Sequence, residues 1–487
     1  MAKVVARETY AGDDDWERLY VDTDNTTQNR LTVVDKQSRR WISWTALKML
    51  FTSVFLPAGY PDSVSNDYLE YQFWDSVQAF ASSIMNNLGT HAVLKGVGVG
   101  DSSATVLAAT ITWLLRDGTS MSGRILFAYI QSSKLDADCK KWRLFADIIN
   151  DISIMIDLLS PYFVDYFMPM QCFSGVLKSL VGTAGGATRA ALTQHQSRRN
   201  NLADVSAKDG SQETLVNLTA LVCSLIMVPI VANNPHLVWL LFICFTILHI
   251  FANYRAVKAV SLETFNLSRF VITVDNWLKT GRILSVREAN NRENVWFFWR
   301  DLSNGYCDNI ATGVSLRDHL CYFEMKIYQT QDNDFQYVLN YDQSMFWRSP
   351  TPCVNISLKK GFETTALLKS IFQAIVLLSG YENCHKNNRI FYRLKVMEEM
   401  LGAMKLLDYS LDDSNNFMNQ LSNYKILQYS HQFTTKWWSE FTDNLVAEGW
   451  DLSKVLITPD EWRFEIQSEL VVNKKINDYR NLNSIKK

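Results

Sequence analysis

The sequence predicts a mainly α-helical membrane domain of about six spans at residues 55–260, followed by a soluble α+β domain at 261–487. Three observations predict this organisation. Residues 215–254 contain no Lys, Arg, Asp or Glu. Basic residues are confined to alternate connections between the apolar segments upstream. Beyond residue 260 the chain becomes densely charged, with strand-like alternation, which is typical of a soluble domain.

Residues 1–54 are predicted to form a polar N-terminal arm that ends in an amphipathic helix. Trp41, Trp44 and Leu47 fall on one face of that helix, and Pro57 lies beyond its end. No long apolar run precedes it, so the sequence predicts no secretory signal peptide.

Six helices are then expected, and the last two of them are the most apolar. Each of these two is at the lower limit of the ~17–25 residues that a bilayer span needs, and "ANNPH" turns the chain between them. The alternative is a buried helical hairpin in a large soluble core. The six expected helices cover residues 73–94, 102–115, 144–163, 172–195, 215–231 and 237–252.

The distribution of basic residues predicts the topology. Connections 97–103, 161–171 and 232–236 contain no Lys or Arg, whereas the alternate connections are basic. This is the positive-inside pattern of a multi-pass membrane protein, although it does not identify the organelle. The charged stretch "GGATRAALTQHQSRRNNLADVSAKDGSQET" is therefore expected to be a cytosolic-side loop between two spans.

The residue pattern of the C-terminal region predicts an antiparallel hairpin followed by helices. "EMKIYQ" and "FQYVLNYD" alternate around "TQDND", and "CVNISLKKG" is expected to be a third strand. "WRFEIQ" is a further candidate strand, and three amphipathic segments between these strands predict helices.

Several stretches resemble one known family. "FLPAGYPDSVSNDYLEYQFWDSVQAF", "LKGVGVGD", "ATITWLLRDGTSMSGRILFA" and "NLADVSAKDGSQET" are similar to the root UVB sensitive (RUS, DUF647) family, most strongly over residues 40–280. The resemblance implies a eukaryotic membrane-associated protein, but no reaction. The family motif loop contains Arg198, Arg199, Asp204, Lys208 and Asp209. The loops after the second and fourth helices also resemble those of major facilitator transporters, and six helices would equal half of such a transporter.

The candidate site residues are charged or glycine residues in the expected helices. Asp147 and Asp151 share one helix face, and Arg189 is expected at similar depth, so the three predict an ion pair or a polar path. The alternative is that the helix at 144–160 is wet on its acidic face. The glycines are expected to allow close or broken helix packing and to line the path. These glycines are Gly96, Gly98, Gly100, Gly182, Gly185 and Gly186.

Other functional classes are not favoured. No catalytic motif or metal-ligand spacing occurs, so no enzyme, cofactor or metal is predicted, and the eight cysteines indicate reduced packing thiols. A net charge of −2 gives no reason to expect nucleic acid. The predicted function is transport, or transport-related handling, of a small-molecule solute in a lipid bilayer. The alternative is a membrane-anchored scaffold whose C-terminal domain binds a protein partner, such as a family paralogue.

Overall fold

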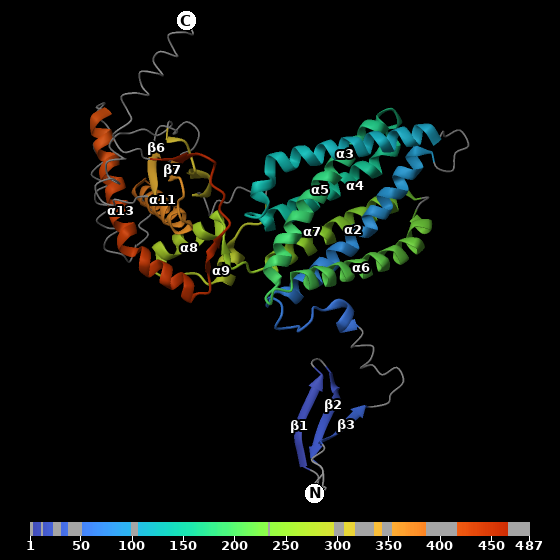
Figure 1. Cartoon of the computed structure of the whole chain (residues 1–487). Coiled ribbons are helices and arrows are strands. Elements are labelled where there is room, and N and C mark those ends of the chain that lie inside the picture. Colours follow the sequence, from blue (N-terminus) through green and yellow to red (C-terminus); the bar gives the residue numbers. More distant parts are fainter. Residues whose placement is uncertain are drawn as a thin grey trace, which may run out of the picture. The chain divides into compact units, whose positions relative to one another are not determined.

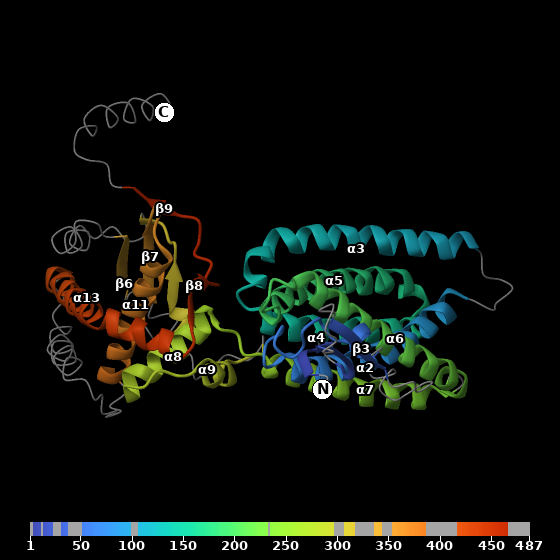
Figure 2. The same cartoon turned by 60° about the horizontal axis from the view of Figure 1, so that its bottom comes forward.

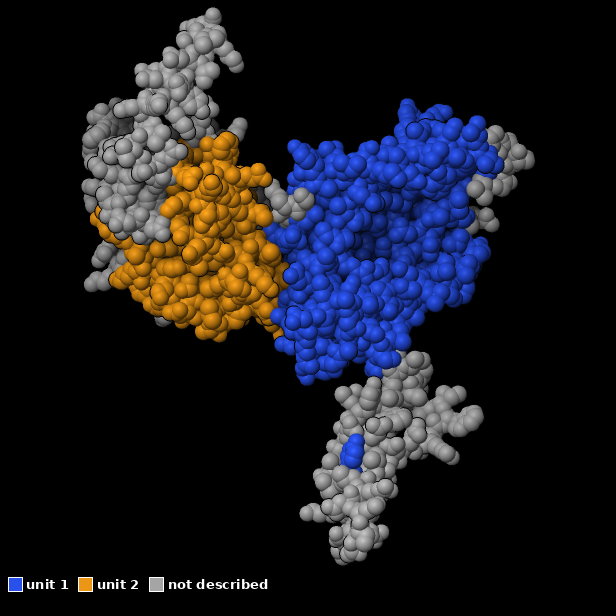
Figure 3. All heavy atoms as spheres, viewed as in Figure 1, with its two compact units in different colours: residues 1–260, 295–298 blue, residues 261–294, 299–487 orange. Residues whose placement is uncertain are grey.

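The computed structural model divides the chain into two units, which are coloured separately in Figure 3. The first unit contains residues 1–260 and 295–298, and the second contains 261–294 and 299–487. The structure describes residues 3–10, 13–22, 31–37, 51–98, 106–231, 234–296, 306–316, 336–342, 353–385 and 416–465.

The N-terminal region forms a three-stranded antiparallel sheet where the sequence suggested only a polar arm. Its strands are β1 (Lys3–Tyr10), β2 (Asp13–Asp22) and β3 (Leu31–Gln37), in the order β1-β2-β3. The register places Glu8 opposite Arg18, and Arg18 opposite Asp35. Opposite charges at paired positions favour a sheet, and they also conceal the apolar alternation by which strands are usually predicted.

The six expected helices are all present, and the fold is confirmed as mainly helical. Each helix is longer than its apolar segment predicted, and Figures 1 and 2 show them lying alongside one another. They are α2 (Tyr68–Val97), α3 (Val106–Leu135), α4 (Cys139–Leu159), α5 (Phe167–Gln196), α6 (Leu202–Val231) and α7 (Pro235–Ala259). Two 3₁₀ turns, η1 (Ser160–Tyr162) and η2 (Val164–Tyr166), join α4 to α5.

The extra length comes from polar segments that resemble loops in the sequence. α3 continues through "RDGTSMSG", where the hydroxyls of Thr119, Ser120 and Ser122 donate to carbonyls four residues earlier. These side chains keep their polar groups bonded within the helix. A charged run can therefore remain helical when its side chains find partners.

The same explanation corrects the expected loop at 185–214. α5 runs to Gln196 and α6 begins at Leu202, so only five residues connect the two helices. Most of the charged residues of this stretch lie on helices and do not form a cytosolic-side loop.

The family motif loop instead holds the segment that precedes α2. Asp204 accepts a hydrogen bond from the Ala58 N–H at 2.7 Å, Lys208 donates to the Ser53 carbonyl, and Arg199 pairs with Asp62 at 3.6 Å. The Arg198 N–H donates to the carbonyl of Ser63. These contacts fix how the chain enters the helical body.

The helices of the first unit pack in two groups that share α4. α5 packs extensively against α3 and α4, and α2 packs against α7, α6 and α4, whereas α5 and α6 contact each other little. Met85, Ile154 and Phe242 belong to one buried apolar cluster, and Trp142 and Ala184 belong to another. The limited contact between α5 and α6 leaves room for the site described below.

The second unit is an α+β domain around a mixed sheet. β6 (Tyr337–Asp342) and β7 (Cys353–Lys359) lie where two of the strands were expected, and β7 is antiparallel to β6 and parallel to β5 (Ile310–Thr312) and β9 (Arg463–Phe464). The candidate strand "EMKIYQ" and the candidate helix at 389–407 lie outside the described residues. The remaining elements are β4 (Thr264–Phe265), α8 (Leu267–Thr280), α9 (Val286–Arg292), η3 (Cys307–Asn309), α11 (Thr364–His385), α13 (Asn416–Ala447) and β8 (Asp451–Val455).

An aromatic core and a buried ion pair hold this unit together. Trp277, Phe372 and Phe441 pack in mutual ring contact. Arg269 Nη1 donates to both carboxylate oxygens of Glu293, at 2.9 and 3.0 Å, and both side chains are buried. At the start of α9, the Glu288 carboxylate accepts a hydrogen bond from the Ser285 N–H and completes a capping box. This hydrogen bond and the Arg282 side chain lower the pKa of Glu288.

We expect a fragment of residues 261–487 to fold without detergent, with the circular dichroism of an α+β domain. A shorter fragment starting at 267 is the control. It lacks β4, which pairs with β8, and the Thr264 carbonyl that accepts from Arg269 Nε, so it should melt at lower temperature. A 261–487 fragment that is unfolded, or soluble only in detergent, would contradict the division into two units.

Candidate functional site

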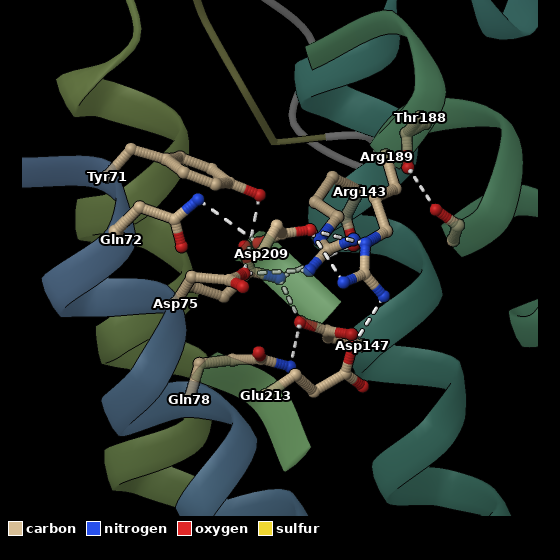
Figure 4. Close-up of polar contacts among 12 residues, drawn as sticks. Tyr71, Gln72, Asp75, Gln78, Arg143, Asp147, Thr188, Arg189, Asp209 and Glu213 are labelled. Atoms are coloured by element: carbon tan, nitrogen blue, oxygen red, sulfur yellow. Dashed lines mark hydrogen bonds and ion pairs between the residues drawn. The ribbon is translucent and has the colours of Figure 1, made fainter. Parts of the chain in front are cut away.

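Charged side chains from α2 and α4 form a buried cluster near the N-terminal end of α4. Arg143 Nη2 lies 2.7 Å from Asp75 Oδ1, and the Tyr71 hydroxyl donates to the same carboxylate at 3.3 Å (Figure 4). Asp147 accepts hydrogen bonds from Gln78 at 2.9 Å and from Asn253 of α7. Buried charges are stable only when paired and hydrogen-bonded, so these contacts explain how the helices tolerate them.

Arg189 does not form the predicted ion pair with Asp147 or Asp151. Its guanidinium instead binds Asp209 at 2.6 Å and Glu213, both on α6 (Figure 4). Asp209 also accepts from Gln72 of α2 at 3.1 Å. Asp209 and Glu213 are four residues apart on α6, so both reach one guanidinium on α5.

Asp147 and Asp151 converge instead on His249 of α7, whose side chain is fully buried. His249 Nδ1 lies 3.0 Å from Asp151 Oδ2, and Nε2 lies 2.9 Å from Gln78 Nε2 and 3.8 Å from Asp147 Oδ2. The predicted shared face of the two aspartates is therefore buried among polar partners. His249, Asp75 and Arg143 were not among the predicted site residues. The available signal for His249 and Asp75 was an ionisable residue within a predicted span, and Arg143 lies one residue before such a span.

A second charged cluster lies around Asp157, towards the C-terminal end of α4. Lys178 and Arg116 lie 2.5 and 3.9 Å from Asp157 Oδ2, and Ser174 donates to Oδ1 at 2.7 Å. Gln171 bridges by accepting from Arg116 at 2.9 Å and donating to Asp157. Two cations thus share one carboxylate that is only 1% exposed.

An open glycine face on α5 lies between these two clusters. Lys178, Gly182, Gly185 and Arg189 follow at spacings of four, three and four, so they share one face over about 16 Å of helix. A Cβ atom placed on Gly182 or Gly185 would meet no atom within 4 Å. We call the open space over these glycines, between Lys178 and Arg189, the polar cleft. Figure 3 shows a hollow in the first unit between the positions of α5 and α6 in Figure 1.

Uncharged polar pairs tie α2 to its neighbours between the two clusters. Asn150 donates to Ser82 at 3.2 Å, and Asn87 donates to Ser224 at 2.8 Å. Ser83 donates to Asn217 of α6. Polar pairs therefore join α2 to α4 and α6 between the two charged clusters, two of them partly buried and the Ser83–Asn217 pair exposed.

The glycines predicted to pack helices closely divide into two sets. A Cβ atom on Gly96 would lie 2.4 Å from the ring of Phe167, so a larger side chain has no room there. Gly98 ends α2 in a left-handed conformation at φ 88°, and Gly100 lies outside the described residues. At Gly182, Gly185 and Gly186 close packing is wrong, because the adjacent space is open.

Two other glycines, Gly123 and Gly175, allow the close approach of α3 and α5. A Cβ atom on Gly175 would lie 2.6 Å from Ser120 Oγ, and one on Gly123 would lie 3.0 Å from Val176. Neither glycine was predicted from the sequence to allow close packing, because neither belongs to a glycine-rich run.

Several helices of the helical body expose large apolar side chains. α6 and α7 are each long and apolar enough to cross a membrane, with mean hydropathy of 2.2 and 2.0 in their most apolar windows. α3 also exposes large apolar side chains, including Ile125 at 73%. On α3, Arg116 faces Asp157 of α4, whereas Asp117 and Arg124 are exposed together with these apolar side chains.

A separate cavity of about 210 Å³ lies near the turn between α6 and α7. Leu88, Leu158 and Trp239 contribute to its mainly apolar wall, with Lys95 and His91 beside them. It contains neither charged cluster, so we place the candidate site at the polar cleft. Within the described ranges, no group of three or more His, Cys, Asp or Glu side chains is arranged to hold a metal ion.

The Arg189–Asp209 contact can be tested by coupling two substitutions in thermal unfolding. Arg189→Leu and Asp209→Asn should be coupled by about 1 kcal/mol or more in thermal unfolding, because each variant removes the same direct ion pair. Arg189→Leu and Asp147→Asn should be additive, since Asp147 bonds to other partners. Coupling to Asp147 in place of Asp209 would contradict the geometry described above.

Paired charges between the helices, together with two helices long enough and apolar enough to cross a membrane, define the class as a mainly helical protein with candidate membrane spans. Residues 41–281 match the family model described as "Vitamin B6 photo-protection and homoeostasis domain", and residues 282–466 match "Root UVB sensitive protein, C-terminal". The chain therefore belongs to the root UVB sensitive family, which confirms the resemblance seen in its motifs.

Several curated relatives are similar to this chain. RUS family member 1 of Dictyostelium discoideum is 49% identical over 267 residues, covering 54% of this chain and 50% of that protein. Protein root UVB sensitive 3 of Arabidopsis thaliana is 42% identical over 245 residues, covering 50% and 56%. Protein root UVB sensitive 6 of the same plant is 26% identical over 418 residues, covering 84% and 76%. The chain thus spans about half the length of the first two relatives. No solved structure matches it.

Proposed function

We propose that α2–α7 form a six-span membrane domain that transports a small polar solute along the polar cleft. The observation that carries the proposal is the open glycine face of α5, which lies between two charged clusters inside an apolar exterior. Ionisable groups inside a membrane are rare, and they commonly mark substrate or ion pathways.

The helix ends support six spans. Lys134, Lys140 and Lys141 lie near the α3–α4 connection, and Arg198 and Arg199 lie in the α5–α6 turn. With antiparallel neighbours, these ends and the end of α7 fall on one side, where positive charge favours the cytosol. The opposite connections at 98–105, 160–166 and 232–234 have no Lys or Arg.

The family description suggests which solutes to test first. It names vitamin B6 homoeostasis, and vitamin B6 compounds are small, polar single-ring molecules. The cleft offers both signs of charge, because Lys178 and Arg189 lie at its ends with acidic partners. We propose a polar solute of this size and assign no enzymatic reaction.

The test has two arms on the full-length chain. The first is alkaline carbonate extraction, in which the protein should remain in the membrane fraction. The second is uptake by proteoliposomes from a panel of small polar solutes that includes the vitamin B6 compounds. Release by carbonate would contradict the six-span domain. Retention without uptake of any solute would contradict transport and favour the membrane-anchored scaffold.

A further inference from the structure

His249, Asp147 and Asp151 form a compact triad that the cleft itself does not use. The imidazole is fully buried and its Nδ1 faces Asp151, at 2.8 Å from Oδ1 and 3.0 Å from Oδ2. Only the Oδ2 contact has hydrogen-bond geometry, so the buried Oδ1 has no hydrogen-bond partner. The triad therefore retains unused capacity for one proton.

The charges around His249 come from α4. Its charged neighbours are Asp147, Asp151 and Arg143, and Arg143 is already paired with Asp75 of α2. α2 contributes the neutral Gln78, and α7 itself contributes the neutral Asn253. Two carboxylates thus face one imidazole with no free cation beside them among the described residues. Buried carboxylates without compensation are costly, so an added proton on the triad is favourable.

Gln78 connects the proton to the helix packing. When the imidazole is neutral, Nε2 can accept a hydrogen bond from Gln78 Nε2, which also donates to Asp147. When Nε2 carries a proton, it becomes a donor and conflicts with that amide group. The amide must then turn or move, which weakens the link between α2 and α4. Protonation therefore changes contacts among three helices, two of which, α2 and α4, also support the charged clusters of the cleft.

We propose that the triad of His249, Asp147 and Asp151 is the binding site of a coupling proton. This inference rests on the proposed transport function, because the proton taken up by the imidazole would drive the solute through the neighbouring cleft. The imidazole would bind a proton from the side of lower pH and release it to the other side, with no other bond made or broken. Histidine suits this role because its charge changes near neutral pH.

The first test measures proton binding without any solute. Full-length protein with ¹⁵N-labelled histidine, in lipid vesicles, should show one imidazole signal that titrates between about pH 5 and 9 and is missing in His249→Gln. The control is His91→Gln, which changes a histidine of α2 outside the triad and should keep that signal. A His249 signal that stays in one protonation state throughout would overturn the proton site.

The second test measures coupling with whichever solute the uptake panel identifies. For one proton per neutral solute, a gradient of one pH unit can drive about a tenfold accumulation. Wild-type vesicles should approach this ratio, whereas His249→Gln should lose accumulation but still exchange solute between the two sides. Wild-type uptake that ignores the gradient would overturn the coupling and leave transport standing. Absence of all uptake would overturn the transport function instead, while the titration decides the proton site separately.

Discussion

Replacing Gly185 by leucine should lower solute uptake by roughly tenfold or more, because passage depends on the diameter and polarity of the path. A Cβ atom at this position meets nothing within 4 Å, so the new side chain starts in open space and projects into the polar cleft. Glycine within a helix is also less favourable than other residues, by ~0.5–1 kcal/mol relative to alanine. The melting temperature in detergent should therefore not fall.

The chain offers matched controls for this substitution. Gly118 of α3 also has open space beside it but is outside the cleft, so Gly118→Leu should leave uptake unchanged and should not lower the melting temperature. Gly175→Leu should unfold the protein, since its Cβ would already lie 2.6 Å from Ser120 Oγ. If Gly185→Leu transports like the wild type, the cleft is not the path.

Asp157→Ala should destabilise the first unit by about 3–5 kcal/mol, because it leaves Arg116 and Lys178 without their shared counter-charge. Asp157 and Arg116 are almost fully buried, whereas Lys178 is about a third exposed, so the lower part of this range applies. The expected result is a marked fall in the melting temperature of the full-length protein in detergent.

A second substitution separates charge from packing. Adding Lys178→Met to Asp157→Ala removes one of the two unpaired cations, so part of the lost stability should return. Asp165→Ala is the control, because this aspartate is exposed in η2 and its loss should have little effect. Asp157→Ala and Asp165→Ala with equal melting temperatures would show that the second cluster is not an ion-pair site.

The helices were predictable from the sequence, and their partners were not. Apolar periodicity located all six helices of the first unit, but it ended the second helix before Arg116 and began the fifth only at Leu215, because charge resembles a loop. In the fold residues 116–135 and 202–214 are helical, and Arg116, Asp209 and Glu213 pair with charges on other helices. Hydropathy detects the apolar side of a helix. It does not detect a polar side that faces another helix.

Arg189 shows why the site could only be partly predicted. Its depth in the helix was inferred from sequence, and Asp147 and Asp151 of the preceding helix have similar depth. The structure pairs Arg189 with α6 instead, because its face of α5 is turned towards Asp209 and Glu213. Depth follows from counting residues, whereas the rotation of a helix about its axis depends on packing that a single sequence does not determine.

The most direct test of the account is the water accessibility of the polar cleft within a membrane. In a cysteine-free background, Gly185→Cys should react with a charged, membrane-impermeant thiol reagent in vesicles. Cys223 of α6, restored alone, is exposed on the apolar exterior. It should react only with a lipid-soluble reagent. This pair of results would establish an aqueous cleft inside a lipid-facing bundle. Equal reaction of both cysteines with the charged reagent, or reaction of neither, would contradict it.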